Sequence, residues 1–215
     1  MDANVIAAMA RWPDVPDVYG WLSLSERGQW RLHPGGDALL DLHGAGEEIS
    51  SPQILQFIGR NYGVDEWGRW YFQNGPQRVY VRLDAAPYIL DTAGTGLELR
   101  THTGLAAGSV LAWWLDDTGR LYARCRQGPG LVAGRDLMDV MDGLCTEDGQ
   151  PLLQALEQDE PCAQPLRVRV AREDSAAAGG TGRRGGASPT RIVALHRCAA
   201  SDIPAALGFQ RLPQP

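Results

Sequence analysis

The residues best suited to recognise another molecule are concentrated in one stretch of the chain, residues 65–80. It reads D-E-W-G-R-W-Y-F-Q-N-G-P-Q-R-V-Y, so indole, phenol, guanidinium and carboxamide groups lie close together. Such groups stack on a ligand or a protein partner and hydrogen-bond to it. Four aromatic residues within six positions cannot all face inward from an alternating strand, so we expect Trp67 or Tyr71 to be exposed. The candidate binding residues are Trp67, Arg69, Tyr71, Asn74, Gln77 and Arg78.

The same stretch is also open to a purely structural interpretation. Residues 73–77 have the composition of a tight turn, and the neighbouring rings could fill a seam between two halves of the protein. The sequence leaves both interpretations standing.

Catalysis requires a nucleophile or a base with an orienting partner, and the sequence assigns no catalytic residue. Asp65 and Glu66 lie at an expected turn, where carboxylates are usually solvated. All 20 basic residues are arginine, which excludes mechanisms that depend on lysine. The alternative to a binding protein is a small hydrolase, in which the fold brings a carboxylate to His33, His43 or His102 at a site between the halves. The pattern favours a non-catalytic protein.

The motifs support neither a metal nor another cofactor. Cys125, Cys145, Cys162 and Cys198 are separated by 20, 17 and 36 residues, which fits no zinc or redox pattern. Without an export signal we expect them to be mostly buried free thiols, although a disulfide between two of them stays open. A G-x-G-x-x-G motif at residues 180–185 follows an alanine run and precedes Gly-Ala-Ser-Pro, where no helix can begin. We expect residues 175–189 to form a flexible loop instead.

The composition is that of a soluble globular protein, with 215 residues and a formal net charge of −6. No apolar run is long enough to span a bilayer, and the acidic balance argues against nucleic-acid binding. The first residues lack the basic start of a secretory signal, so we expect a cytoplasmic protein. Arginine without lysine, with abundant alanine and glycine, is typical of a high-GC bacterial genome. The partner class is a small molecule or a protein, and a homodimer stays open.

The elements that position these residues form a repeat of hairpins. One pattern, an alternating strand, a polar turn with a glycine and a second strand, occurs at residues 22–32, 62–72 and 113–123. Aligned on the glycine, apolar residues fall at −6, −4, +2 and +4 in all three copies. The glycine suits a left-handed turn position, where a Cβ would clash. A weaker fourth copy spans residues 145–152.

A helix is expected after the first hairpin and again after the third. Ser51 and Pro52 begin one over residues 52–60, and residues 135–142 form the other, ending at Gly143. Strands at residues 77–83 and 165–170 follow the second and fourth copies. The predicted fold class is α+β, with two tandem similar halves, each an antiparallel sheet of hairpins covered by one main helix. The predicted domains are an N-terminal helix with its lead-in (1–16), a first half (17–104) and a second half (105–215).

Two segments, residues 12–24 and 70–81, resemble a family of small proteobacterial proteins of unknown function. They read W-P-D-V-P-D-V-Y-G-W-L-S-L and W-Y-F-Q-N-G-P-Q-R-V-Y-V. The resemblance is best over the first 90 or so residues and becomes thin in the second half. It implies a bacterial, soluble, cytoplasmic protein and assigns no binding or catalytic residue.

Overall fold

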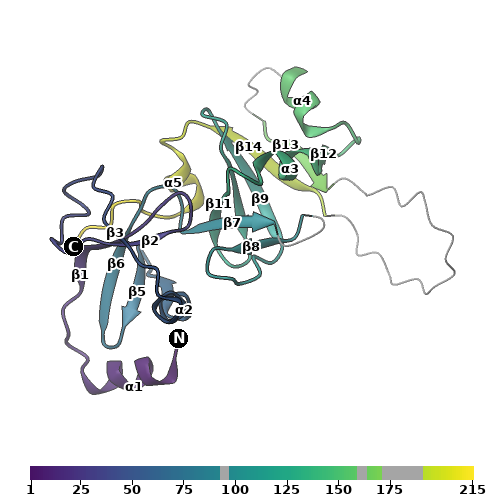
Figure 1. The fold of residues 1–215 in the computed structure, drawn as a ribbon. Coiled ribbons are helices and arrows are strands. Elements are labelled where there is room, and N and C mark those ends of the chain that lie inside the picture. The colour runs from purple at the N-terminus through teal and green to yellow at the C-terminus, as the bar shows by residue number, and fades with distance from the viewer. Residues whose placement is uncertain (93–96, 159–163, 171–190) are drawn as a thin grey trace, which may run out of the picture.

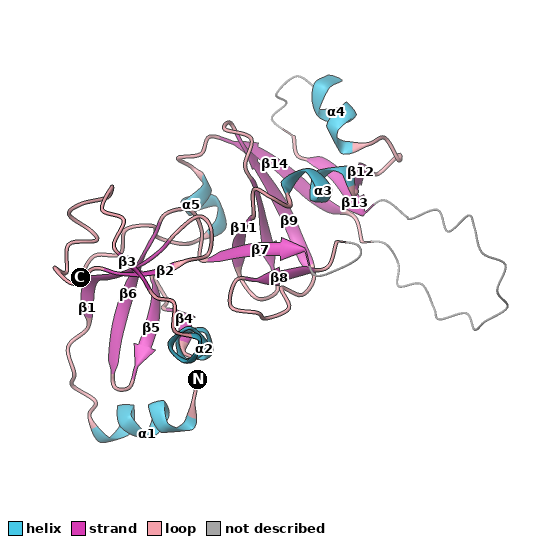
Figure 2. Cartoon of the chain, in the orientation of Figure 1, coloured by secondary structure: helices cyan, strands magenta, loops and turns pink. Residues whose placement is uncertain are grey.

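The computed structural model describes residues 1–92, 97–158, 164–170 and 191–215 (Figure 1). The expected loop at residues 175–189, its glycine motif at residues 180–185 and Cys162 lie outside the described residues. No helix in the described ranges is long and apolar enough to cross a bilayer. The helices are short and flank two β-sheets (Figure 2), and their bounds are α1 Ala3–Arg11, α2 Pro52–Arg60, α3 Leu137–Asp142, α4 Leu152–Gln158 and α5 Ile203–Leu207.

The strands of the described residues form one six-stranded and one eight-stranded sheet. The first sheet has the order β3-β2-β1-β6-β5-β4, with β1 Val18–Leu24, β2 Trp30–Leu32, β3 Glu47–Glu48, β4 Tyr62–Val64, β5 Trp70–Asn74 and β6 Gln77–Leu83. The second has the order β12-β13-β14-β9-β10-β11-β7-β8, with β7 Tyr88–Thr92, β8 Leu99–Thr101, β9 Val110–Asp116, β10 Leu121–Cys125, β11 Pro129–Val132, β12 Leu144–Thr146, β13 Leu166–Val170 and β14 Val193–Cys198. The fold class is α+β, as predicted.

Both sheets are mixed, whereas the sequence predicted antiparallel sheets. β1 runs parallel to β6, β9 runs parallel to β14, and β11 runs parallel to β7. The hairpins themselves are antiparallel, as short turns require. The parallel pairs arise because longer connections bring strands that are distant in sequence to neighbouring positions. A hairpin pattern carries no information about those neighbours.

The two sheets share one arrangement of six strands. The series β3-β2-β1-β6-β5-β4 corresponds in order to β11-β10-β9-β14-β13-β12. Neighbouring strands that are parallel or antiparallel in the first series are paired in the same sense in the second. In the chain, α2 lies between β3 and β4, and α3 lies between β11 and β12. We call residues 18–83 the first unit and residues 110–198 the second unit. β7 and β8 belong to the second sheet as an additional edge hairpin, although the predicted first half, 17–104, includes them.

The glycines of the three hairpin turns have the expected left-handed conformation. Gly28, Gly68 and Gly119 have φ values of +82°, +78° and +81°. In the second copy the first turn residue, Asp65, accepts hydrogen bonds through Oδ1 from the backbone N–H of Arg69 at 2.9 Å. A polar side chain that caps its own turn and a glycine with positive φ are local features. This part of the prediction is confirmed.

The fourth copy forms the turn and a single antiparallel bridge between Cys145 and Pro151, but no second strand. Gly149 has φ +95°, and α4 begins at Leu152, where the sequence predicted a second strand. Pro151 suits the start of a helix, and leucine, glutamine and alanine in the following residues are good helix formers. A second correction concerns residues 165–170, which the sequence matched to residues 77–83. The counterpart of β6 is β14, whereas β13 corresponds to β5.

Candidate functional site

Strand alternation places the candidate binding residues on two faces of the first sheet. β5 and β6 are antiparallel, with Tyr71 opposite Tyr80 and Asn74 opposite Gln77. Side chains on a strand point alternately to opposite faces, so Tyr71 and Asn74 point to different ones. The six residues therefore do not form one surface.

Four of the candidates lie in a ladder of rings and guanidinium groups on one face. Cζ of Arg69 lies 4.7 Å from the ring centroid of Trp67 and 4.7 Å from that of Tyr80. Tyr80 meets Tyr71 edge-on at 5.7 Å, and Arg78 lies over Tyr71 at 4.8 Å. Tyr80 belongs to the stretch 65–80 but was not among the predicted binding residues. Its position opposite Tyr71 depends on the register of β6.

Two polar members of this ladder, Arg69 and Tyr80, hydrogen-bond to other groups of the protein. Arg69 donates from Nε to Oδ2 of Asp65 at 2.8 Å and from Nη1 to the carbonyl oxygen of Gln214 at 2.8 Å. Tyr80 donates to Asp65 Oδ2 at 3.0 Å, and burial raises the pKa of Tyr80 to about 12. Trp67 is 60% exposed, as expected of one of the two rings, and Tyr71 is buried. The ladder fastens the C-terminal segment to the first unit.

The remaining two candidates, Asn74 and Gln77, line a hollow of about 410 Å³ on the opposite face. We call it the first hollow. Strands β1, β2, β5 and β6 contribute to its wall, and α2 closes one side with Ile54 and Ile58. Its lining residues are Val18, Trp21, Leu22, Leu32, Ile49, Ile54, Ile58, Phe72, Asn74, Gln77 and Val79.

The chemistry of the first hollow is apolar with two amides at its edge. None of the described residues that line it is charged. Trp21, Leu32 and Ile54 remain 44%, 40% and 49% exposed around it. Gln77 donates from Nε2 to the carbonyl oxygen of Pro16 at 3.0 Å, which holds this side chain at the rim. The hollow can therefore take an apolar body and offer amide groups to a polar substituent.

His33 is the centre of a buried polar cluster in the first unit. Its Nε2 lies 2.9 Å from Ser23 Oγ, and its Nδ1 lies 3.8 Å from Asp37 Oδ1, beyond hydrogen-bond distance. Ser23 and His33 are 0% and 3% exposed, and neither lines the first hollow. Burial and then the charge of Arg82 lower the pKa of His33. The cluster has the composition of a hydrolase triad without its geometry or access.

The other histidines do not form a catalytic pair either. His102 is half-buried at the contact between the two sheets, where its ring centroid lies 5.9 Å from that of Tyr88. Its Nδ1 accepts a hydrogen bond from the backbone N–H of Ile89 at 3.2 Å. His43 is exposed, and His196 stacks on Trp114. Across the described ranges, no histidine side chain is within hydrogen-bond distance of a carboxylate.

Trp70 lies at the contact between the two sheets. Its ring meets Tyr88 of the second sheet edge-on at 5.1 Å. Among the cysteines that the structure describes, Cys125 and Cys145 are buried free thiols and Cys198 is a half-buried one. Burial raises the pKa of Cys125 to about 11, so it is not a reactive thiolate. The described residues contain no cluster of three or more ligands that could hold a metal ion.

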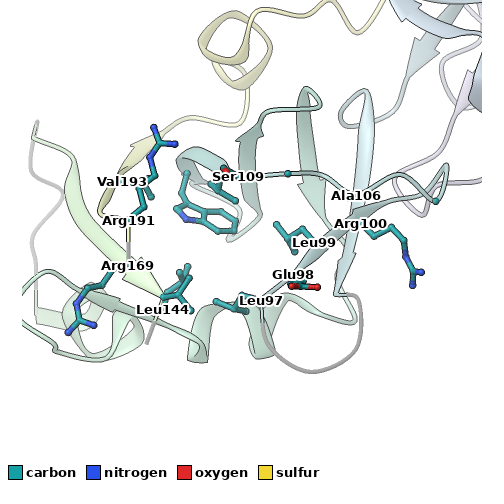
Figure 3. A pocket seen from close by; sticks show the side chains of 15 residues that line it. Leu97, Glu98, Leu99, Arg100, Ala106, Ser109, Leu144, Arg169, Arg191 and Val193 are labelled. Atoms are coloured by element: carbon teal, nitrogen blue, oxygen red, sulfur yellow. The ribbon is translucent and has the colours of Figure 1, made fainter. Parts of the chain in front are cut away.

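A second hollow, of about 740 Å³, lies on the second sheet (Figure 3). Leu97, Leu99 and Leu144 lie around its centre, whereas the guanidinium groups of Arg100 and Arg169 are turned outward from it (Figure 3). Its full lining is Leu97, Glu98, Leu99, Arg100, Gly104, Ala106, Gly108, Ser109, Val110, Trp113, Leu144, Arg169, Val170, Arg191 and Val193. None of these residues was predicted as a binding residue, because they come from five separate strands and the segments beside them.

Comparisons with known proteins give a family but no activity. No curated protein matches the chain. A DUF1285 family protein from Silicibacter pomeroyi DSS-3 is similar in structure, with a TM-score of 0.46, 18% identity and coverage of 74% of this chain and 100% of that one. Another, from Shewanella baltica OS155, has a TM-score of 0.41, 12% identity and coverage of 56% and 89%. A family model named DUF2944, with the description "Protein of unknown function (DUF2946)", matches residues 1–214. Because this match extends over almost the whole chain, the protein belongs to the DUF2944 family of proteins of unknown function.

Proposed function

We propose that the protein is a non-catalytic binding protein and that the first hollow takes a small, uncharged, largely apolar molecule. The observation that carries this proposal is the exposure of Trp21, Leu32 and Ile54 around one cavity. Large apolar side chains gathered at a cavity mark a binding site more often than scattered ones do. Covering them contributes about 25 cal/mol for each Å² of apolar surface removed from water.

Size and charge support a small uncharged molecule as the occupant. A volume of about 410 Å³ is within the range of small-molecule sites. A charged ligand would lose its hydration at a wall that offers no ion-pair partner, which costs several kcal/mol. Asn74 and Gln77, which the sequence predicted as binding residues, supply the polar contacts that would orient the ligand.

The setting of this function is a bacterial cytoplasm, with the protein acting as an accessory factor. The arginine-only basic composition and the acidic net charge support that setting. The shared order of six strands supports an internal duplication as the origin of the two units. A homodimer through the same apolar rim is the competing use of this surface.

Titration with N-phenyl-1-naphthylamine, an uncharged fluorescent probe, tests the proposal. Ile54→Glu places a carboxylate in the wall and should weaken probe binding about tenfold or more. Met138→Glu is the matched control, because Met138 is also an exposed apolar residue on a helix but lies outside the first hollow. We expect the control to bind the probe like the wild type. Equal binding by both variants would remove the first hollow as the site.

The oligomeric state separates the two uses of the rim. Light scattering after size exclusion should give the mass of a monomer for the wild type and for Ile54→Glu. A wild-type dimer that Ile54→Glu converts to a monomer would assign the rim to self-association instead.

A further inference from the structure

The two hollows occupy equivalent positions in the two units. Leu22 on β1 pairs with Val81 on β6 and with Leu32 on β2. Trp113 on β9 pairs in the same way with Leu195 on β14 and with Ala123 on β10. Leu22 and Trp113 are therefore counterparts, and each lines the hollow of its own unit.

The outer strands extend the correspondence. Val79 lies two residues before Val81, the partner of Leu22, and lines the first hollow. Val193 lies two residues before Leu195, the partner of Trp113, and lines the second hollow. In the first unit, Phe72 is opposite Val79, and Asn74, two residues further along β5, therefore lies at the rim of the first hollow. In the second, Val168 is opposite Val193, which brings Val170 to the matching place.

The rims of the two hollows differ in charge. Gln77 in the first corresponds to Arg191 in the second, because Gln77 is opposite Asn74 and the register that places Val168 opposite Val193, continued by two residues, places Arg191 opposite Val170. Arg100 and Arg169 also line the second hollow, with Glu98 as the one acid among its described lining residues. None of these three arginines forms an ion pair with a described residue.

The centre of the second hollow is apolar. Trp113, Leu99 and Leu144 are 3%, 6% and 1% exposed and form its base, and Val170 is 45% exposed at its edge. Three cationic groups around an apolar base match a molecule with an apolar tail and a negative head group. The volume of about 740 Å³ admits a larger molecule than the first hollow does.

We propose that the second hollow binds a free single-chain anionic amphiphile, an alkyl carboxylate, with its chain on Trp113 and the leucines and its head group at Arg169 and Arg191. The arginine side chains turn inward to meet the carboxylate, which is a change of side-chain rotamers at the surface. The head group supplies the anionic partner that these arginines lack among the described residues.

Calorimetric titration of the full chain with decanoate, below its micelle concentration, tests this site. The double variant Arg169→Gln/Arg191→Gln should bind decanoate about tenfold or more weakly, since it loses the charge-assisted hydrogen bonds to the carboxylate. Its affinity for 1-decanol should stay within about twofold of the wild type, because the apolar base is intact. Arg11→Gln/Arg27→Gln removes the same charge from exposed arginines elsewhere and should leave both affinities unchanged.

Two results would overturn the proposal. One is that the wild-type protein does not bind decanoate. Binding to phosphatidylglycerol vesicles without binding to free decanoate counts as this result, because the proposed ligand is a free amphiphile. The other is decanoate binding that is lost in Ile54→Glu but kept in the double arginine variant, which would place the anion in the first hollow. Ile54→Glu alters the first hollow and leaves the second unchanged. Decanoate binding by this variant therefore tests the second hollow separately from the proposed function of the first.

Discussion

Arg69 donates a hydrogen bond to the carbonyl oxygen of Gln214 at 2.8 Å, across 145 residues of chain. The same guanidinium group is paired with Asp65, and the backbone N–H of Gln210 donates to the carbonyl oxygen of Gly68 at 2.9 Å. The last residues of the chain thus return from the second unit to the first (Figure 1). Arg69, which the sequence predicted as a binding residue, therefore holds the C-terminal segment against the first unit.

Replacing Arg69 should destabilise the protein strongly. Arg69→Gln leaves the carboxylate of Asp65, which is 5% exposed, without its charge partner, and such a loss costs about 3 kcal/mol. For a chain of this length that lowers the melting temperature by about 6–12 °C. Arg27→Gln, at an exposed position in the first hairpin turn, should change stability by less than about 0.5 kcal/mol. Similar melting temperatures for the two variants would contradict the closing role of Arg69.

Acid should destabilise the protein through His102. Burial lowers the pKa of His102 to about 4, below the ordinary value of 6.5. Between these values the unfolded chain binds a proton that the folded protein does not, so stability is full above pH 6.5 and falls as the pH decreases toward 4. The expected loss is about 3 kcal/mol over this window.

Urea unfolding at several pH values from 4.5 to 7.5 measures this slope. His102→Phe should be less stable than the wild type at pH 7.5, because the N–H of Ile89 loses its acceptor. Its stability should nevertheless vary less with pH. An unchanged slope in this variant would assign the acid sensitivity to another group.

The turn glycines should differ in their tolerance of a side chain. A Cβ on Gly68 would lie 2.7 Å from the carbonyl oxygen of Gly208, whereas a Cβ on Gly119 would meet no atom within 4 Å. Both have positive φ, so Gly119→Ala should cost about 1 kcal/mol from backbone strain alone. Gly68→Ala should cost more, because the C-terminal segment must also move. Equal decreases in melting temperature for Gly68→Ala and Gly119→Ala would show that the C-terminal segment moves at no cost in stability.

Arg82 should control the segment that covers Ser23 and His33. Its guanidinium group is 4% exposed and donates to the carbonyl oxygens of Ala38 at 2.9 Å and Asp41 at 3.0 Å. Arg82→Lys keeps the charge but cannot reach several carbonyl groups with one fixed fork. We expect chymotrypsin to cut within residues 34–46 several-fold faster, with mass spectrometry locating the cuts. Arg11→Lys is the control, and the same rate in both variants would argue against this role.

Much of the local structure could be predicted because its causes are local. The turn at Gly68 follows from Asp65 and the glycine themselves, and α2 follows from Pro52 and the spacing of its apolar residues. Sequence alone also predicted that Trp67 or Tyr71 would be exposed. The prediction of a second strand after Gly149 was wrong, because the residues that follow it have a helix propensity that exceeds their strand signal.

The candidate site was only partly predictable, because alternation and register act across strands. The sequence grouped Arg69, Tyr71 and Asn74 by their closeness along the chain, whereas the sheet sends Tyr71 and Asn74 to opposite faces. Tyr80 joined the ladder only through its register with Tyr71. No window of sequence around β5 contains that information.

By itself, the sequence determined the α+β class, the repeated turns and the main helices, since each depends on residues within about ten positions of one another. Tertiary structure decided the parallel pairing of β1 with β6 and of β9 with β14, and with it the two hollows. The free energy that selects those neighbours comes from burying apolar faces contributed by distant strands. That is why Leu22 and Trp113, 91 positions apart, became counterparts only in the folded protein.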